Sequence, residues 1–296
     1  MDLSKVRGRD VQIHPLSFVS PKAKIGHDVQ IGPFCVVEKG VEIGNGCILE
    51  ARVSIKEGAV LGENNHLCEG AVIGGLPQHV AIPDECGLVI IGSENMIREN
   101  VTIHRALKES NATVVGDNNL LMVNVHVAHD CRLGNNIVMA NNAMLAGHVT
   151  VGDRANISGA AGVHQFCRVG GYTMVGGQAH ITQDIPPFVT VDGLTSHIVG
   201  LNMIGLRRAG FSAEDIKQLK EAYHIAFRGQ MPWREVLKCL EEQYPKGAVA
   251  ELTRFLSTTS RGIIREGRRH SVVPTLRLHR VDEETEEVTT IRLNAG

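Results

Sequence analysis

The sequence predicts a mainly β protein with an added helical part. We expect a parallel β-helix over residues 1–190, a small helical domain over 191–265 and an extension of unknown structure over 266–296. Three observations carry this prediction. Aliphatic residues recur at every sixth position, aromatic residues make up only 4% of the chain beside 32 glycines, and the repeat stops after "QDIPPF" at 183–188.

The six-residue repeat decides the architecture of the first part. It runs without a miss from Ile13 to Ile73 and again from Val115 to Ile181, with a short stretch between them. A period of six fits neither a helix nor an amphipathic strand, but it fits short strands joined by turns and wound into a three-sided prism. Three repeats make one coil, so residues 18 apart stack about 4.8 Å apart along the axis. Glycine often follows the aliphatic residue, as in "VEIGNG", and we expect it to supply the backbone freedom of a tight corner.

Two breaks in the repeat, at 74–90 and 104–114, predict loops ejected from the prism. Such loops commonly carry function on a regular scaffold. Beyond the repeat, residues 197–209 have a helical pattern, and Ser212 with Asp215 predicts a capping box at the start of a later helix. The alternating apolar residues of the extension fit either a hairpin or a disordered segment.

Composition excludes several classes of protein. The net charge of −2 gives no overall attraction to nucleic acid or to an anionic membrane. No run of 18 apolar residues predicts a membrane span, and the first residues lack the apolar core of a signal peptide. The seven cysteines are scattered without a C-x-x-C pair, which argues against a disulfide framework and a thiolate zinc site. We expect a cytoplasmic protein that binds no nucleic acid.

Stacking by 18 residues gathers histidines around the stretch "NVHVAHDC". Four histidines and one acid fall on three consecutive coils: His126, His129, Asp130, His148 and His164. His129 stacks on Gly147, and Gly147 stacks on Gln165. Asp130 stacks on His148, so that polar side chains from different coils meet on one part of the prism.

This cluster has three readings. Polar side chains on the outside of a prism are often merely solvated. Zinc is the second reading, since gamma-class carbonic anhydrases hold it with histidines on such a scaffold, although no histidine spacing here matches theirs. The third is general-base catalysis, because a neutral imidazole oriented by a carboxylate can take a hydroxyl proton near neutral pH. With the N–H of Gly147 beside His129 to meet an oxyanion, base and oxyanion donor together suggest acyl transfer.

Longer strings in the chain resemble the UDP-N-acetylglucosamine O-acyltransferase family, the first acyltransferases of lipid A synthesis. The resemblance covers about residues 10–265 and rests on "IGPFCVV", "IRENVTIHR", "DNNLLMVNVHVAHDC", "ANNAMLAGHVTVGD", "VHQFC", "MVGGQ" and "GLRRAGFS". It implies a left-handed prism and a homotrimer with active sites in the clefts between prisms. It also implies transfer of a 3-hydroxyacyl chain from acyl carrier protein to the 3-position of UDP-N-acetylglucosamine, with no cofactor and no metal.

The resemblance also assigns roles by position. His129 would deprotonate the sugar hydroxyl, Asp130 would hold its orientation, and Gly147 would donate its N–H to the oxyanion. Residues that would contact the substrates are His126, His148, His164, Gln165 and Asn202. Arg208 would face the nucleotide phosphates. Gly177 stands where family members limit acyl-chain length, and a glycine there suggests room for a longer chain.

The part that reads the acceptor departs from the family pattern. Family members carry Gln-Asp with a lysine two residues after the Asp, whereas this chain has Gln78, His79 and then Ala81. The usual glutamate near "GLNMIGLRRAG" is Ile204, and the second arginine of the pair is Ala209. Loss of a charged contact to a sugar hydroxyl is worth about 1.5–3 kcal/mol. Either the loop has drifted with the acceptor unchanged, or His79 substitutes for the acid, or the acceptor differs. A 3-amino analogue would make the enzyme an N-acyltransferase, and another sugar nucleotide is the remaining choice.

The helical domain is expected to dock the carrier protein, which is an acidic partner. Basic residues there include Lys217, Lys220 and the run "SRGIIREGRRH" at 260–270, although such runs are often solvated faces. A zinc hydratase and a non-catalytic paralogue on the same scaffold remain as alternatives to the acyltransferase.

Overall fold

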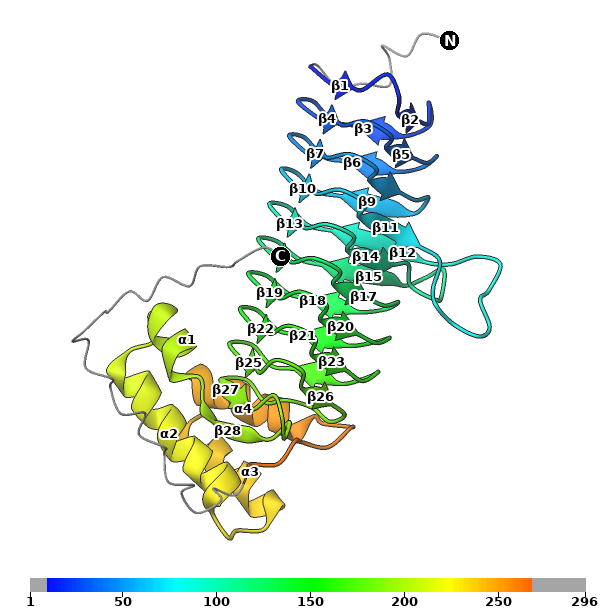
Figure 1. Ribbon diagram of the computed structural model, residues 1–296. Helices are drawn as coiled ribbons and strands as arrows, with labels where there is room; N and C mark the ends of the chain where they lie inside the picture. The colour runs from blue at the N-terminus through cyan, green and yellow to red at the C-terminus, as the bar shows by residue number, and fades with distance from the viewer. Residues whose placement is uncertain (1–9, 268–296) are drawn as a thin grey trace, which may run out of the picture.

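A computed structural model describes residues 10–267, most of which form a three-sided prism of stacked coils (Figure 1). The eleven-stranded face consists of β1 (Gln12–Ile13), β4 (Gln30–Ile31), β7 (Ile48–Leu49), β10 (His66–Leu67), β13 (Met96–Ile97), β16 (Leu120–Leu121), β19 (Val138–Met139), β22 (Asn156–Ile157), β25 (Met174–Val175), β27 (Val189–Val191) and β28 (Ile198–Leu201). The nine-stranded face consists of β2 (Phe18–Val19), β5 (Val36–Val37), β8 (Ser54–Ile55), β11 (Val72–Gly75), β14 (Thr102–His104), β17 (His126–Val127), β20 (Met144–Leu145), β23 (Gly162–Val163) and β26 (His180–Ile181). The eight-stranded face consists of β3 (Lys24–Ile25), β6 (Glu42–Ile43), β9 (Ala59–Leu61), β12 (Leu88–Ile91), β15 (Ala112–Val115), β18 (Arg132–Leu133), β21 (Thr150–Val151) and β24 (Arg168–Val169).

The register of the strands confirms the predicted stacking by 18 residues. In the parallel pair β17 and β20, His126 lies opposite Met144 and Val127 lies opposite Leu145. The offset exceeds 18 only where chain is ejected, as where Ile73 lies opposite Ile103, and it shortens to 16 at the last coil, where Met174 lies opposite Thr190. The ejected segments are 76–87 and 105–111, somewhat shorter than predicted because their flanks extend β11, β12, β14 and β15.

The interior of the prism is filled by two positions of each repeat. The aliphatic residue of the repeat points inward, and so does the small residue two positions before it, such as Val29 or Cys47. Three buried asparagines also occupy this second position: Asn65, Asn95 and Asn119. The Asn95 side chain donates to Asn65 Oδ1 at 2.9 Å and accepts from the Asn119 amide at 2.9 Å. Their polar groups are therefore paired inside an otherwise apolar core.

The glycine after the aliphatic residue does not supply the left-handed backbone, so that expectation is wrong for nearly all of these positions. Positive φ occurs two residues later, as at Asp130 (φ 60°) and His148 (φ 61°), and Gly74 is an exception at 85°. The glycine is needed instead for close stacking between coils. A Cβ on Gly62 would lie 2.7 Å from the carbonyl oxygen of Gly92 on the next coil.

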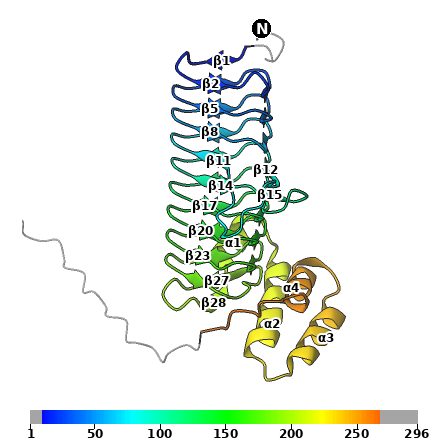
Figure 2. The ribbon, with the colours of Figure 1, turned by 90° about the vertical axis from the view of Figure 1, so that its right-hand side faces the viewer.

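A helical part covers one end of the prism (Figure 2). It contains α1 (Met203–Arg208), α2 (Ala213–Arg228), α3 (Trp233–Gln243) and α4 (Gly247–Ser257), whose buried faces share one apolar cluster with Phe188. The capping box of Ser212 and Asp215 is present at the start of α2. None of the helices among residues 10–267 is long and apolar enough to cross a membrane.

The helical part begins later than predicted. Residues 198–201 form β28, which pairs antiparallel with β27 and extends the eleven-stranded face. The helix predicted over 197–209 is therefore wrong for its first half, because strand pairing with the last coil overrides the local helical preference. The alternatives for the extension, a hairpin or a disordered segment, concern residues that lie almost entirely outside the described range.

After α4 the chain returns to the prism. Isolated parallel bridges join Ile263 to Asp184 and Glu266 to Ile198. The amide of Asp184 donates to Gly262 O at 2.8 Å, and the amide of Ile264 donates to Asp184 O at 3.0 Å. We refer to residues 259–267 as the return segment.

Candidate active site

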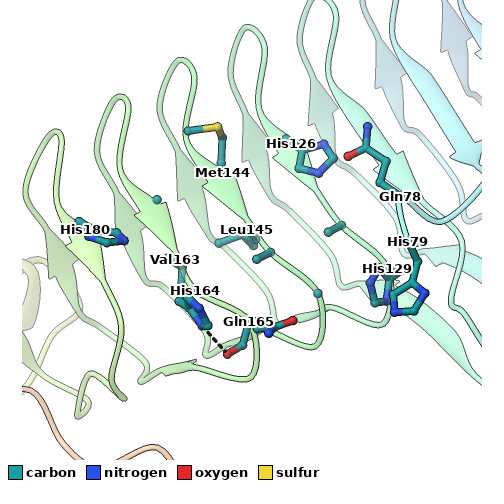
Figure 3. A pocket seen from close by; sticks show the side chains of 14 residues that line it. Gln78, His79, His126, His129, Met144, Leu145, Val163, His164, Gln165 and His180 are labelled. Atoms are coloured by element: carbon teal, nitrogen blue, oxygen red, sulfur yellow. Dashed lines mark hydrogen bonds between the residues drawn. The ribbon is translucent and has the colours of Figure 1, made fainter. Parts of the chain in front are cut away.

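An open groove of about 450 Å³ runs across four coils of the nine-stranded face (Figure 3). Its polar lining comes from Gln78, His79, His126, His129, His164, Gln165 and His180. Its floor is apolar or bare: Ala128, Met144, Leu145, Ala146, Gly147, Gly162 and Val163. The groove therefore brings together His126, His129 and His164 of the predicted cluster, with His79 beside His129 and His180 several coils away, whereas His148 and Asp130 are not among its lining residues.

His129 has the surroundings of a general base. Its side chain is 10% exposed, and its Nδ1 lies 2.9 Å from Asp130 Oδ2. An ionised carboxylate can only accept, so Nδ1 carries the proton of the neutral ring and Nε2 keeps the lone pair. A Cβ built on Gly147 would lie 2.7 Å from Nε2. The basic nitrogen therefore faces the bare backbone of Gly147.

Asp130 is held by the ejected 105–111 loop as well as by His129. Its carboxylate accepts from the Leu107 amide at 2.9 Å and from Asn111 Nδ2 at 3.1 Å. Its own amide donates to Thr113 Oγ1 at 2.8 Å. Burial alone raises the pKa of this carboxyl, but the hydrogen bonds from Leu107, His129 and Asn111 outweigh burial and hold the pKa below its usual value. Asp130 is thus a fixed, ionised acceptor.

The ionised state of Asp130 leads to a pH-dependent stability. Because its folded pKa is depressed, the charge stabilises the fold above the unfolded pKa of about 3.9, and this is lost as pH falls through the folded pKa. We expect Asp130→Asn to lower the urea midpoint at pH 7 and to have a smaller effect at pH 3, where the carboxyl of the unfolded chain is protonated and the wild type has lost part of this stabilisation. Urea unfolding at the two pH values measures this. An equal loss at both would contradict it.

His148 packs against His129 from the next coil. The two ring centroids are 5.2 Å apart with perpendicular planes, and His148 stacks on Phe166 at 4.6 Å. Burial lowers the pKa of His148, and although the nearby Asp130 opposes this effect, the net direction is downward. His148 is therefore a neutral imidazole at physiological pH that can donate or accept without adding charge.

His126 lies further along the same face. Thr102 Oγ1 is 2.8 Å from its Nδ1, and the ring of His104 is 5.1 Å away. Burial, followed by the proximity of His104, lowers the pKa of His126. His104 was not predicted, because the ejected loop breaks the count that would place it beside His126. His180 was also missed, although stacking from His126 through Met144 and Gly162 leads to it.

The two residues of the altered acceptor loop reach the groove. Gln78 lines it, and the ring of His79 lies 5.8 Å from that of His129 with perpendicular planes. The backbone of Ala81 fixes His79, with its oxygen 3.0 Å from Nδ1. An imidazole thus stands beside that of His129.

Besides Asp130 and His148, three predicted residues are not among those that line the groove: Asn202, Arg208 and Gly177. Asn202 caps α1, since its Oδ1 accepts from the Gly205 amide at 3.0 Å and its Nδ2 donates to Tyr172 O at 2.9 Å. Arg208 ends the same helix. Gly177 lies at a corner of the prism, where a Cβ would come no closer than 3.4 Å to any other atom. The substrate contacts assigned to these three residues stay predictions.

By distance alone, a metal ion could be held at His129. The ligand atoms of His129, Asp130 and His148 lie within 4.8 Å of one another. However, the Asp130 carboxylate already accepts three hydrogen bonds from the protein. A cation would have to compete with these donors. In residues 10–267 the Gly147 amide donates to no protein group, so this N–H is free to donate to a ligand.

Comparisons with known proteins show to which family the chain is similar. Residues 184–264 match the family described as UDP N-acetylglucosamine O-acyltransferase, domain 2. Residues 40–75 and 112–147 match the bacterial transferase hexapeptide repeats. An acyl-[acyl-carrier-protein]–UDP-N-acetylglucosamine O-acyltransferase of Sulfurihydrogenibium sp. is 51% identical over 265 residues, which covers 89% of this chain and 98% of the relative. An enzyme of the same name from Thermodesulfovibrio yellowstonii is 42% identical, covering 86% of this chain and 99% of the relative.

Solved structures give the same result for the fold. The crystal structure of a UDP-N-acetylglucosamine acyltransferase from Francisella novicida superposes with a TM-score of 0.83 at 37% identity, covering 86% of this chain and 94% of that one. The corresponding protein from Bacteroides fragilis gives a TM-score of 0.83 at 39% identity, covering 86% of this chain and 100% of that one. The repeats and these similarities confirm the predicted left-handed β-helix followed by helices.

Proposed function

Because this chain belongs to the UDP-N-acetylglucosamine O-acyltransferase family, we propose that it transfers a 3-hydroxyacyl chain from acyl carrier protein to the 3-position of UDP-N-acetylglucosamine, the first step of lipid A synthesis. The observation that carries the proposal is the pair of neighbours around His129. Asp130 fixes its Nδ1 at 2.9 Å, and its Nε2 faces the bare backbone of Gly147.

The reaction follows from this pair. Nε2 of His129 takes the proton of the sugar hydroxyl as its oxygen attacks the thioester carbonyl carbon. The carbonyl oxygen becomes an oxyanion and accepts from the Gly147 N–H, while Asp130 stabilises the imidazolium. The intermediate then collapses, the C–S bond breaks, and the imidazolium returns its proton to the departing thiolate. Ester and free carrier thiol are the products.

Neighbouring side chains hold the substrates around this centre. His126, His148, His164 and Gln165 contact the sugar and the donor arm, and the depressed pKa values of His126 and His148 keep these two neutral there. Asn202 and Arg208 act from a neighbouring prism of a homotrimer, with Arg208 on the nucleotide phosphates. An open groove on one prism is closed to water by the next, which strengthens the charge interactions of the transition state. We place the enzyme in the cytoplasm.

A direct assay tests the activity. The purified protein is incubated with acyl carrier proteins bearing 3-hydroxyacyl chains of several lengths, together with UDP-N-acetylglucosamine or its 3-amino analogue, and products are detected by mass spectrometry. We expect an ester on UDP-N-acetylglucosamine. Transfer of the longer chains would support the role of Gly177. Absence of product with both acceptors would contradict the proposal.

The amide-forming alternative is favoured by one observation, the imidazole of His79 beside His129. An amide product without any ester would establish that alternative.

If the acceptor is UDP-N-acetylglucosamine, His79 takes over the contact of the missing acid. We then expect His79→Ala to raise the KM for the acceptor about tenfold and to change kcat much less, because a ground-state hydrogen bond is lost. Steady-state kinetics measure this, with Val80→Ala as the control on the same loop, where the side chain is fully exposed. An unchanged KM in His79→Ala would mean that the loop has drifted without consequence.

A further inference from the structure

The groove continues beyond His180 into a second, polar hollow of about 200 Å³. His180 lines both spaces, so they meet at this residue. The second hollow is also lined by Gln183, Ser196, His197 and Arg265. It is therefore built from the last coil of the prism and from the return segment, and the mechanism described above does not use it.

The return segment brings two arginines to this end of the groove. Its bridges to the last coil place Arg261 so that Nη2 lies 3.1 Å from Thr182 O and 3.1 Å from His164 Nδ1. Arg265, four residues on, lines the hollow directly. One arginine thus touches a histidine of the catalytic groove, and the other lines the hollow that continues it.

The carboxylates nearest in the chain are engaged by other cations. Asp184 Oδ2 accepts from Arg168 Nε at 2.8 Å, and Glu266 Oε1 accepts from Arg228 Nη2 at 2.7 Å. Within residues 10–267, neither Arg261 nor Arg265 forms an ion pair, and the Nε of Arg261 is buried without a hydrogen-bond partner. Two guanidinium groups without an ion pair in this described part of the chain, one lining the hollow and the other donating to Thr182 of its lining, favour an anion. A phosphate fits their planar donors well.

The distance from His129 to the hollow matches the length of a pantetheine arm, which ends in a phosphate. Gln183 lies three coils beyond His129 in the 18-residue stack, which is about 14 Å at the strand spacing. An extended pantetheine arm spans on the order of 15 Å from its sulfur to its phosphate at covalent bond lengths. A thioester with its carbonyl between His129 and Gly147 can therefore lay its arm along the groove and end in the hollow.

We propose that Arg261 and Arg265 bind the phosphate of the donor's pantetheine arm in this hollow. The inference rests on the proposed acyl transfer, and it assigns the arginines to the arm itself rather than to the protein surface of the carrier. Carrier protein and coenzyme A both contain a phosphopantetheine arm, so the site would bind a phosphate that both donors share.

The test compares two small donors that differ only in the phosphate, a 3-hydroxyacyl pantetheine and the same acyl 4′-phosphopantetheine. We expect the wild type to prefer the phosphorylated donor in kcat/KM by about ten- to a hundredfold, the range of a charged hydrogen bond. In Arg265→Gln and in Arg261→Gln this preference should fall toward one, and Arg265→Lys should keep part of it. Arg234→Gln, on an exposed position of α3, is the matched control and should keep the full preference.

Several results would overturn the inference. Equal use of the two small donors by the wild type would contradict it, and so would full retention of the preference in both glutamine variants. A raised KM for acyl carrier protein in Arg265→Gln, without any change in the small-donor preference, would mean that this arginine contacts the protein surface of the carrier instead. Failure of the proposed function is distinct, because the wild type would then give no product with acyl carrier protein or with either small donor.

Discussion

His129→Ala should lower kcat by about 10²- to 10⁴-fold, the usual contribution of a positioned general base. The reason is geometric as well as chemical. Nε2 of His129 is the basic nitrogen that faces Gly147, while His148 stands on the next coil with its ring centroid 5.2 Å away. Initial rates with acyl carrier protein and UDP-N-acetylglucosamine measure the loss. Circular dichroism melting curves confirm that the variant still folds.

The chain contains its own control for this experiment. His27 and Asp28 form the same dipeptide at the same place in the repeat, with His27 Nδ1 2.6 Å from Asp28 Oδ2 and Asp28 at φ 57°. The side chain of His27 is 55% exposed, and it does not line the catalytic groove. His27→Ala should leave kcat unchanged. If His129→Ala kept a tenth or more of the wild-type kcat, His129 would not be the base.

Gly147→Ala is expected to lower kcat by about 10²- to 10³-fold, comparable to the loss of an oxyanion donor. The added Cβ would lie 2.6 Å from Cε1 and 2.7 Å from Nε2 of His129, closer than unbonded atoms approach. Either the imidazole turns away or the backbone carrying the N–H shifts, and both disturb the reaction. Rates and melting curves are measured as for His129→Ala.

Gly159→Ala is the matched substitution, because Gly159 occupies the same place in its repeat. There a Cβ would meet only Asn141 O at 3.3 Å, so a small adjustment accommodates it. We expect Gly159→Ala to keep most of the activity. Near-normal rates for Gly147→Ala would show that neither the oxyanion nor His129 depends on the bare backbone at this position.

The sequence predicts the central pair of the site because the repeat itself fixes positions in space. Once each coil takes 18 residues, His129 must stack on Gly147 and Asp130 on His148, and the register confirms it. Counting by 18 does not predict the positions of residues in the ejected loops. Leu107 and Asn111, which hold Asp130, and His79, which stands beside His129, come from segments whose length breaks the count.

Local patterns also mislead where neighbouring coils decide the outcome. The glycine after each aliphatic residue looks like a corner residue, yet Gly62 is needed because the carbonyl of Gly92 stacks close to it. Residues 198–201 look helical, yet they pair with β27 at the end of the prism. In both cases a contact between chain segments, which no local pattern contains, determines the structure.

The left-handed corner has a consequence for how such a protein acquires an activity. The backbone at Asp130, with φ 60°, is nearly the same as at Asp28, with φ 57°. The two corners therefore have the same backbone conformation, and the His–Asp dipeptide at each of them forms a similar hydrogen bond. The corner at Asp130 differs from the corner at Asp28 in the ejected segments 76–87 and 105–111, which contact His129 and Asp130. Evolution can therefore relocate or invent chemistry on this scaffold by altering insertions, while the framework of coils is inherited unchanged.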